Sequence, residues 1–242
     1  MDQLHLNFDE PTTPYQVRRS RRRRTLAVAI DVDQGVVVYS PYRLAQAEID
    51  AFLKQKQRWI SDKLGQMQAL REHRPQVRWE AGAQVPFRGA TLSLEIAPGA
   101  ARERMVLLGD TLRMEWRGAE APPPAEAARL AARWYREQAR QIIHERVVHY
   151  QGQLEVQPRR ITVKNQKRRW GTCTSRGALY FNWRLILAPP AVLDYVVVHE
   201  LCHLRELNHS PRFWRLVHAV LPDAAARKTW LRQHGMTLEL DL

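Results

Sequence analysis

The sequence has few cysteines, no long apolar run and no secretory leader pattern. Its two cysteines, Cys173 and Cys202, are too few for a disulfide framework, which predicts a reducing environment. No stretch reaches the ~20 uninterrupted apolar residues of a membrane span, and residues 1–5 lack the basic-then-apolar order of a secretory signal. These absences argue against a disulfide-stapled secreted domain and against an integral membrane protein. A cytoplasmic globular protein is the expectation.

Acidic charge is also scarce. The chain has 38 Lys and Arg against 25 Asp and Glu, which gives a formal net charge of +13. Such a surplus attracts polyanions through long-range fields, so non-specific binding of nucleic acid is one interpretation. The alternative is a solvated basic surface. For the arginine run at 21–24 the sequence favours that alternative, as a solvent-facing strand or turn beside a hairpin.

Residues 1–118 are predicted to form a β-rich N-terminal lobe. A hairpin is expected over 26–39 and one long helix over 44–70, where apolar residues recur at helical spacing. Short strands separated by Gly and Pro turns are expected across 77–116. The prolines at 122–124 mark a joint too short for a flexible linker, so this lobe is expected to pack on the next one.

Residues 119–242 are predicted to form a second lobe, which makes the chain an α+β protein. A strong helix rich in Ala, Arg, Glu and Gln is expected over 125–150. The other expected elements are two short strands and two helices, at 161–163, 178–183, 191–207 and 210–220.

The segment His199-Glu200-Leu201-Cys202-His203 carries the chemistry. On a helix, His199 and His203 lie one turn apart on the same face, so both imidazoles can approach one ion. Zinc binds neutral imidazole readily, and Glu200 can reach a water on that ion. This is the H-E-x-x-H pattern of metallopeptidases. The apolar β-branched residues before it indicate a buried helix, and buried His and Glu need partners such as a metal.

A third ligand is expected from the bend after this helix, and His209 is the candidate. Asn208 tolerates the left-handed conformation that ends helices. Ser210 is a good N-cap and Pro211 suits the first turn of a following helix. His209 therefore lies at a sharp junction between two helices, where its side chain can be directed back to the metal.

With these residues, the C-terminal half resembles the YgjP-like metallopeptidase family, which is related to the SprT-like and WLM peptidases. The resemblance spans about residues 15–235, and its motifs are the segments at 164–173, 181–185, 199–203, 208–210 and 213–214. It implies a zincin-like lobe with an active-site helix and a small sheet. It further implies one zinc ion per chain on His199, His203 and His209, with Glu200 as the catalytic base.

Several alternatives stay open at this point. Glu206 or Asp223 could replace His209 as third ligand, and Glu206 occupies the glycine position of the metzincin pattern, which argues against that group. Trp170 and Arg184 are candidate donors to the oxyanion. The function expected first is a zinc peptidase acting on proteins or peptides. The other readings are a nucleic-acid-associated peptidase that acts on DNA-bound proteins, and a zinc-binding scaffold without turnover.

Overall fold

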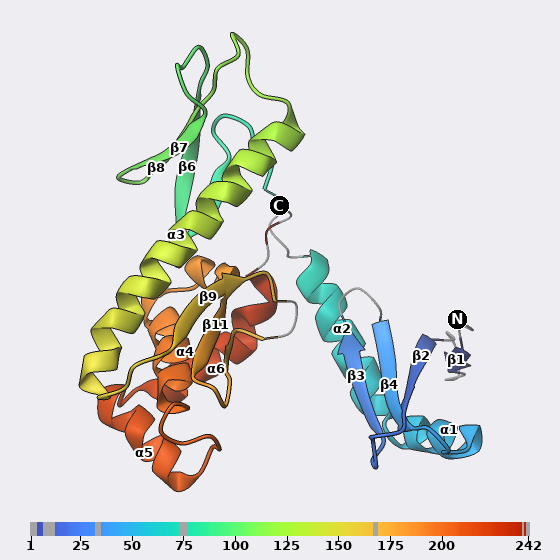
Figure 1. Ribbon diagram of the computed structural model, residues 1–242. Helices are drawn as coiled ribbons and strands as arrows, with labels where there is room; N and C mark the ends of the chain where they lie inside the picture. Colours follow the sequence, from blue (N-terminus) through green and yellow to red (C-terminus); the bar gives the residue numbers. More distant parts are fainter. Residues whose placement is uncertain are drawn as a thin grey trace. The chain divides into compact units, whose positions relative to one another are not determined.

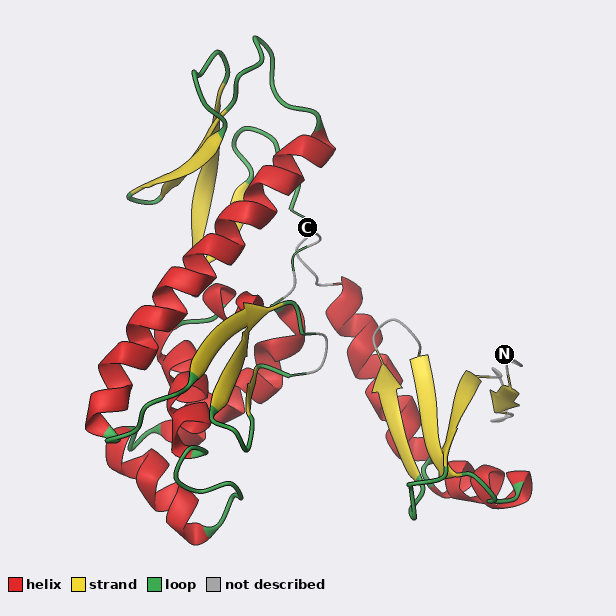
Figure 2. Ribbon diagram, in the orientation of Figure 1, coloured by secondary structure: helices red, strands yellow, loops and turns green. Residues whose placement is uncertain are grey.

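The computed structural model describes residues 4–6, 13–31, 35–72, 77–166, 169–238 and 240. The chain divides into two compact units, Met1–Arg74 and Pro75–Leu242 (Figure 1). Both units mix helices with small sheets, so the α+β class is observed (Figure 2). Across the described ranges, no helix combines the length and apolar character needed to cross a membrane.

The first unit combines a four-stranded sheet with two helices. Its elements are β1 Leu4–Leu6, β2 Thr13–Ser20, β3 Ala27–Asp31, β4 Gly35–Pro41, α1 Gln46–Gln55 and α2 Gln57–Glu72. The strand order is β1-β2-β4-β3, with β2 and β4 parallel and the other pairs antiparallel. The predicted hairpin is present as the β3–β4 pair, in which Ala27 lies opposite Tyr39.

The helix predicted over 44–70 is two consecutive helices. Lys56 separates them with φ −96° and ψ 4°, and its N–H donates to the carbonyl of Leu53 at 3.0 Å. A bond of this short i→i+3 kind tightens and ends a helix. Ile49, Leu53 and Ile60 are nevertheless buried in one cluster. The apolar spacing that predicted a helix is therefore preserved across the break.

The second unit contains two sheets and four α-helices within its described residues. Its elements are β5 Gln84–Phe87, β6 Ala90–Ala97, β7 Arg104–Leu108, β8 Thr111–Glu115, α3 Pro124–Gln153, β9 Arg160–Lys164, β10 Gly171–Cys173, β11 Ala178–Asn182, the 3₁₀-helix η1 Trp183–Leu187, α4 Pro190–Cys202, α5 Pro211–Val220, α6 Ala224–His234 and η2 Gly235–Thr237. The sheet orders are β5-β6-β8-β7 and β10-β11-β9. The long helix α3 runs beside both sheets (Figure 1).

The predicted lobe boundary at 118/119 falls inside the second unit, between β8 and α3. The ring of Phe87 in β5 lies 5.0 Å from that of Trp134 in α3, and the Tyr135 hydroxyl donates to the Pro86 carbonyl at 2.7 Å. These contacts make the β5–β8 sheet and α3 parts of one hydrophobic core. The prolines at 122–124, which predict a joint between lobes, instead precede and begin helix α3. A fixed φ is favourable at the start of a helix.

Helix α4 is buried in the centre of the second unit, in contact with α3, α5, α6 and β10. It is fixed to α3 by Arg146, whose guanidinium donates to both oxygens of Asp194 at 2.7 and 3.0 Å. The Tyr150 hydroxyl donates to the same carboxylate at 3.0 Å. The helix ends at Cys202, earlier than the predicted span of 191–207, and the chain continues in turns. This early end lets the following bend return toward the helix.

Candidate metal centre

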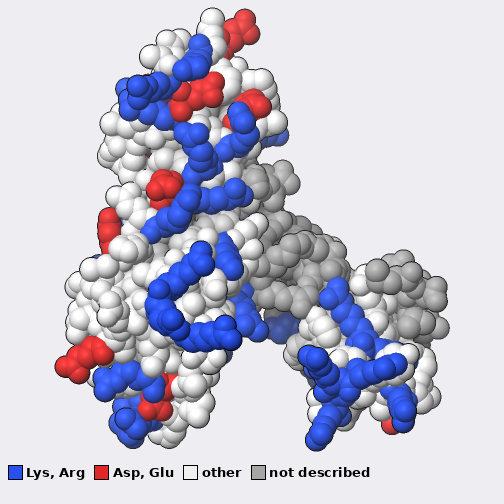
Figure 3. Space-filling model, in the orientation of Figure 1, with Lys and Arg blue, Asp and Glu red and all other residues white. Residues whose placement is uncertain are grey.

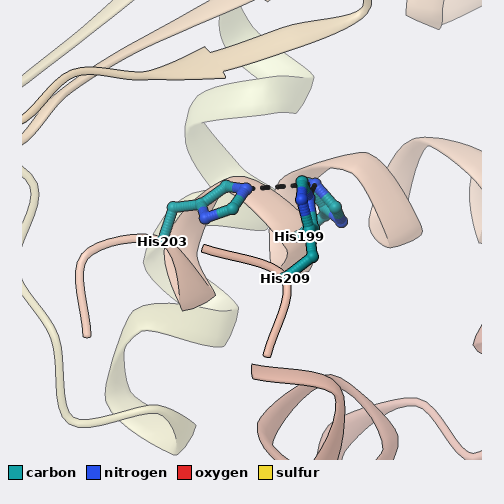
Figure 4. Close-up of side chains that lie close together, drawn as sticks. All are labelled: His199, His203 and His209. Atoms are coloured by element: carbon teal, nitrogen blue, oxygen red, sulfur yellow. Dashed lines mark hydrogen bonds between the residues drawn. The ribbon is translucent and has the colours of Figure 1, made fainter. Parts of the chain in front are cut away.

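Three imidazoles converge at the C-terminal end of α4 (Figure 4). His199 and His203 lie one helical turn apart, and their Nε2 atoms are 3.2 Å from each other. The Nε2 of His209 lies 3.0 Å from that of His199. The ligand atoms of all three lie within 4.8 Å of one another. The structure therefore brings together the three histidines that the sequence singled out.

In the bend that carries His209, Ser210 and Pro211 act as the sequence predicts, whereas Asn208 is not among the residues with the left-handed conformation expected of it. The Ser210 hydroxyl accepts a bond from the Phe213 N–H at 3.3 Å and caps α5, and Pro211 is the first residue of that helix. The Nδ1 of His203 lies 3.0 Å from the carbonyl oxygen of Glu206 within the same bend. A carbonyl oxygen only accepts, so this Nδ1 carries a proton, and Nε2 is the ring nitrogen of His203 that is left to bind a metal.

Two of the three nitrogen spacings, those from His199 to His203 and to His209, are close to the spacing around a tetrahedral metal ion. Ligands about 2.0–2.1 Å from a zinc ion at tetrahedral angles lie about 3.3–3.4 Å apart, close to the 3.0 and 3.2 Å observed. Burial, and then the charges of His203, His209 and Lys228, lower the pKa of His199 to about 3. Its imidazole is therefore neutral, which is the form that binds metal.

Glu200 lies beside this group in a tight enclosure. Only 6% of the residue is exposed, and burial raises the pKa of its carboxyl to about 7, against the lowering effect of a bond from the Cys173 N–H. A Cβ placed on Gly171 of β10 would lie 2.5 Å from both Cγ and Oε1 of Glu200. The backbone of β10 thus presses directly on the carboxyl group and holds it in place.

Comparisons with known proteins place the chain in a family. A family model described as "YgjP-like, metallopeptidase domain" matches residues 24–234. The chain belongs to the YgjP-like metallopeptidase family. Among solved structures, it is similar to the metallopeptidase zymogen of Pyrococcus abyssi abylysin, with a TM-score of 0.35 and 22% identity over 38% of this chain and 92% of that one. Among curated proteins, none matches the chain.

Family membership confirms the resemblance drawn from the sequence motifs. The YgjP-like chain is a metallopeptidase, so it is a hydrolase that uses a metal ion and takes a protein or peptide as substrate. Part of the quoted motif, Lys167 and Arg168, lies outside the described residues.

The two alternative third ligands, Glu206 and Asp223, each form an ion pair with an arginine in this YgjP-like unit. The carboxylate of Glu206 is 2.9 Å from Nε of Arg212. That of Asp223 is 2.9 Å from Nε of Arg227. Both carboxylates are therefore neutralised by neighbours, whereas the imidazole of His209 points into the histidine group (Figure 4).

The candidate oxyanion donors are engaged in packing. The guanidinium of Arg184 lies 4.8 Å from the Trp183 ring and donates to the Asn165 side chain. The ring of Trp170 packs on Gly235, where a Cβ would lie 3.1 Å from it. Both side chains therefore have packing partners within this unit.

An aromatic layer, not singled out as such by the sequence, supports the histidines. Phe213 is fully buried and stacks on His203 with 4.5 Å between ring centroids. Trp214 stacks on His209 at 5.9 Å, and Nζ of Lys228 lies 4.7 Å from the centre of the Trp214 ring. Packing of this kind fixes ring orientation before a metal binds.

Proposed function

We propose that this protein hydrolyses peptide bonds with a zinc ion held by His199, His203 and His209 and with Glu200 as the general base. The observation that carries the proposal is the convergence of three imidazoles at the end of α4, the helix that also carries the buried carboxyl of Glu200. Three imidazoles with no thiolate among them are a donor set that suits zinc, and three protein ligands leave a fourth position open.

The chemistry follows from the position of Glu200. A zinc ion in such a site supplies an activated water and polarises the substrate carbonyl. Glu200 accepts the proton that the water loses as its oxygen bonds to the carbonyl carbon. The same carboxyl then gives that proton to the amine as the C–N bond breaks. Burial raises the pKa of this carboxyl above its ordinary value, which favours its uptake of the proton from the water.

The edge of β10 that faces away from β11, where the Cys173 N–H bonds to Glu200, is the proposed docking line for the peptide. The Trp170 carbonyl and the Thr174 N–H bond to β11, at 2.8 and 2.9 Å. Because backbone groups alternate sides along a strand, those of Gly171 and Cys173 face the other way, toward Glu200. An extended substrate added along this edge would bring its carbonyl to the site by main-chain pairing.

Removing one histidine tests the metal site. We expect purified protein to carry about one zinc per chain, and His203→Ala to weaken zinc binding by more than the roughly 10- to 100-fold that loss of an outer partner costs. His144→Ala, which changes an exposed histidine on α3, should keep its zinc. Zinc content and casein cleavage would be measured on the same samples. We expect a chelator to abolish the cleavage and added zinc to restore it. Wild-type protein that neither holds zinc nor gains peptidase activity from it would refute the proposal.

A second candidate function, binding of single-stranded nucleic acid, is favoured by one pocket in the first unit. It has a volume of about 510 Å³ and is lined by Arg21, Arg23, Arg43, Tyr42 and Pro41. The Arg21 guanidinium lies 5.2 Å from the centre of the Tyr42 ring, and Tyr42 is 54% exposed. Cationic groups beside an exposed aromatic side chain suit phosphates and bases together. Figure 3 shows Lys and Arg gathered at one end of this unit.

The salt dependence of binding tests this candidate. Each phosphate contact with a single strand contributes about 0.7 to the slope of log affinity against log salt. The double change Arg21→Ala and Arg23→Ala should therefore reduce the slope by about 1.4, measured by fluorescence anisotropy with a labelled oligonucleotide. The paired change Arg129→Ala and Arg140→Ala on α3 removes the same charge and should leave the slope unchanged. Binding that ignores salt would contradict a phosphate contact.

A further inference from the structure

A pocket opens beside His203, on the side of the histidine group where the chain leaves α4. Its volume is about 410 Å³. Its walls are the segment before β9, the turn between β10 and β11, and the residues that follow α4. Arg159, Arg176 and Arg205 come one from each of these walls, and His203 itself lines the pocket.

The three arginines give the pocket an unbalanced positive charge. Within the part of the chain that the structure describes, none of them forms an ion pair with a carboxylate, and Glu155 is the one acidic residue in the lining. Arg205 is fixed by a bond from Nη1 to the Leu154 carbonyl at 3.2 Å. Some surface arginines elsewhere in the unit have carboxylate partners, such as Glu126 for Arg129. Guanidinium groups left without a carboxylate in a pocket are suited to bind one from a ligand.

The apolar residues in the pocket lining further restrict the chemical type of ligand that fits the pocket. Val156, Leu204 and Leu207 contribute carbon surface, and Leu207 is 70% exposed. A small inorganic anion would leave that surface uncovered. A side chain with a methylene stem and a terminal carboxylate would cover it and still reach the arginines.

The pocket also lies along the proposed path of the substrate. β10 leads from Gly171, which contacts Glu200, to the turn that contributes Thr174 and Gly177 to the pocket wall. At about 3.3 Å per residue, a peptide extended along β10 would reach the pocket roughly two to four residues from the bond that is cut.

We propose that this arginine pocket binds an acidic side chain of the peptide substrate, two to four residues from the scissile bond, and so sets a preference for Glu or Asp there. This inference rests on the proposed peptidase function. It adds a class of substrate, acidic peptides, that neither the histidine group nor the family description specifies.

The test compares pairs of peptides that differ only by Glu or Gln at each position around a cleaved bond. All peptides have blocked ends, so that a terminal carboxylate cannot replace the side chain. With zinc-loaded protein we expect kcat/KM to be at least tenfold higher for the Glu member at one position two to four residues from the cut. The double change Arg159→Glu and Arg176→Glu should abolish that preference and favour Lys. Arg129→Glu with Arg140→Glu, the same change of charge on α3, should preserve it.

Binding provides a second measurement that does not need turnover. Zinc-loaded Glu200→Gln protein should bind the Glu peptide more tightly than the Gln peptide, and added salt should reduce the difference. Cleavage by the wild type with equal rates for both members would overturn the pocket assignment and leave the peptidase function in place. If zinc-loaded wild type cleaves no peptide and the Glu200→Gln protein binds both members equally, both proposals fail. Selective binding without any cleavage would retain the acidic pocket and refute the peptidase function.

Discussion

Replacing Glu200 with glutamine is expected to slow peptide hydrolysis by about 10²–10⁴-fold, the range over which general acid–base groups contribute. The amide has nearly the same shape, and its oxygen can still accept the bond from the Cys173 N–H. It cannot take a proton from water at neutral pH, so the loss should appear in kcat. Zinc content should stay at the wild-type value, because the ligands His199, His203 and His209 are untouched.

The same variant also reports on stability. Glu200 is buried, and burial raises its pKa, so the charged form is disfavoured where it lies. A neutral amide avoids that desolvation, and the unfolding midpoint should be unchanged or higher. Glu137→Gln, which alters a surface residue paired with Arg140, is the matched control and should keep full activity. A Glu200→Gln protein that retains more than a tenth of wild-type activity would rule out Glu200 as the base.

The histidine group could be predicted from the sequence because every determinant of it is local. His199 and His203 need only one helical turn to face the same way. The bend that brings His209 to the group can be predicted from the residues that follow it, because Ser210 caps α5 and Pro211 begins it. Interactions within a dozen residues along the chain are the ones that residue types and spacing encode directly.

The parts that the sequence did not predict depend on distant contacts. β10 is three residues long and exists because it pairs with β11, so no period within it could indicate a strand. Helix α6 has a single buried residue, Ala224, among the positions described, and its apolar pattern is correspondingly weak. The β5–β8 sheet and α3 lie in one compact unit because Phe87 packs on Trp134, a contact that composition near the prolines at 122–124 does not reveal.

Gly171→Ala is the sharpest test of how the carboxyl is positioned. The added Cβ would lie 2.5 Å from Cγ and Oε1 of Glu200, far closer than non-bonded atoms pack, so either the carboxyl or β10 must move. The φ of Gly171 is not among the positive values of the chain, so glycine is needed there for space and not for backbone conformation. Because misplacing a catalytic group by about 1 Å can cost about 10²-fold in rate, we expect a loss of that order with zinc retained.

Two comparisons separate this steric effect from general damage. Gly152→Ala in α3 places its Cβ in open space and should leave both activity and stability intact. In the double variant, Gly171→Ala should add little to the loss caused by Glu200→Gln, because both changes disable one carboxyl and residues that act as a unit are not additive. Independent, multiplying losses would mean that β10 contributes to catalysis by another route, such as binding the peptide along its edge. Full activity in Gly171→Ala would show that the position of the Glu200 carboxyl is not set by contact with this strand.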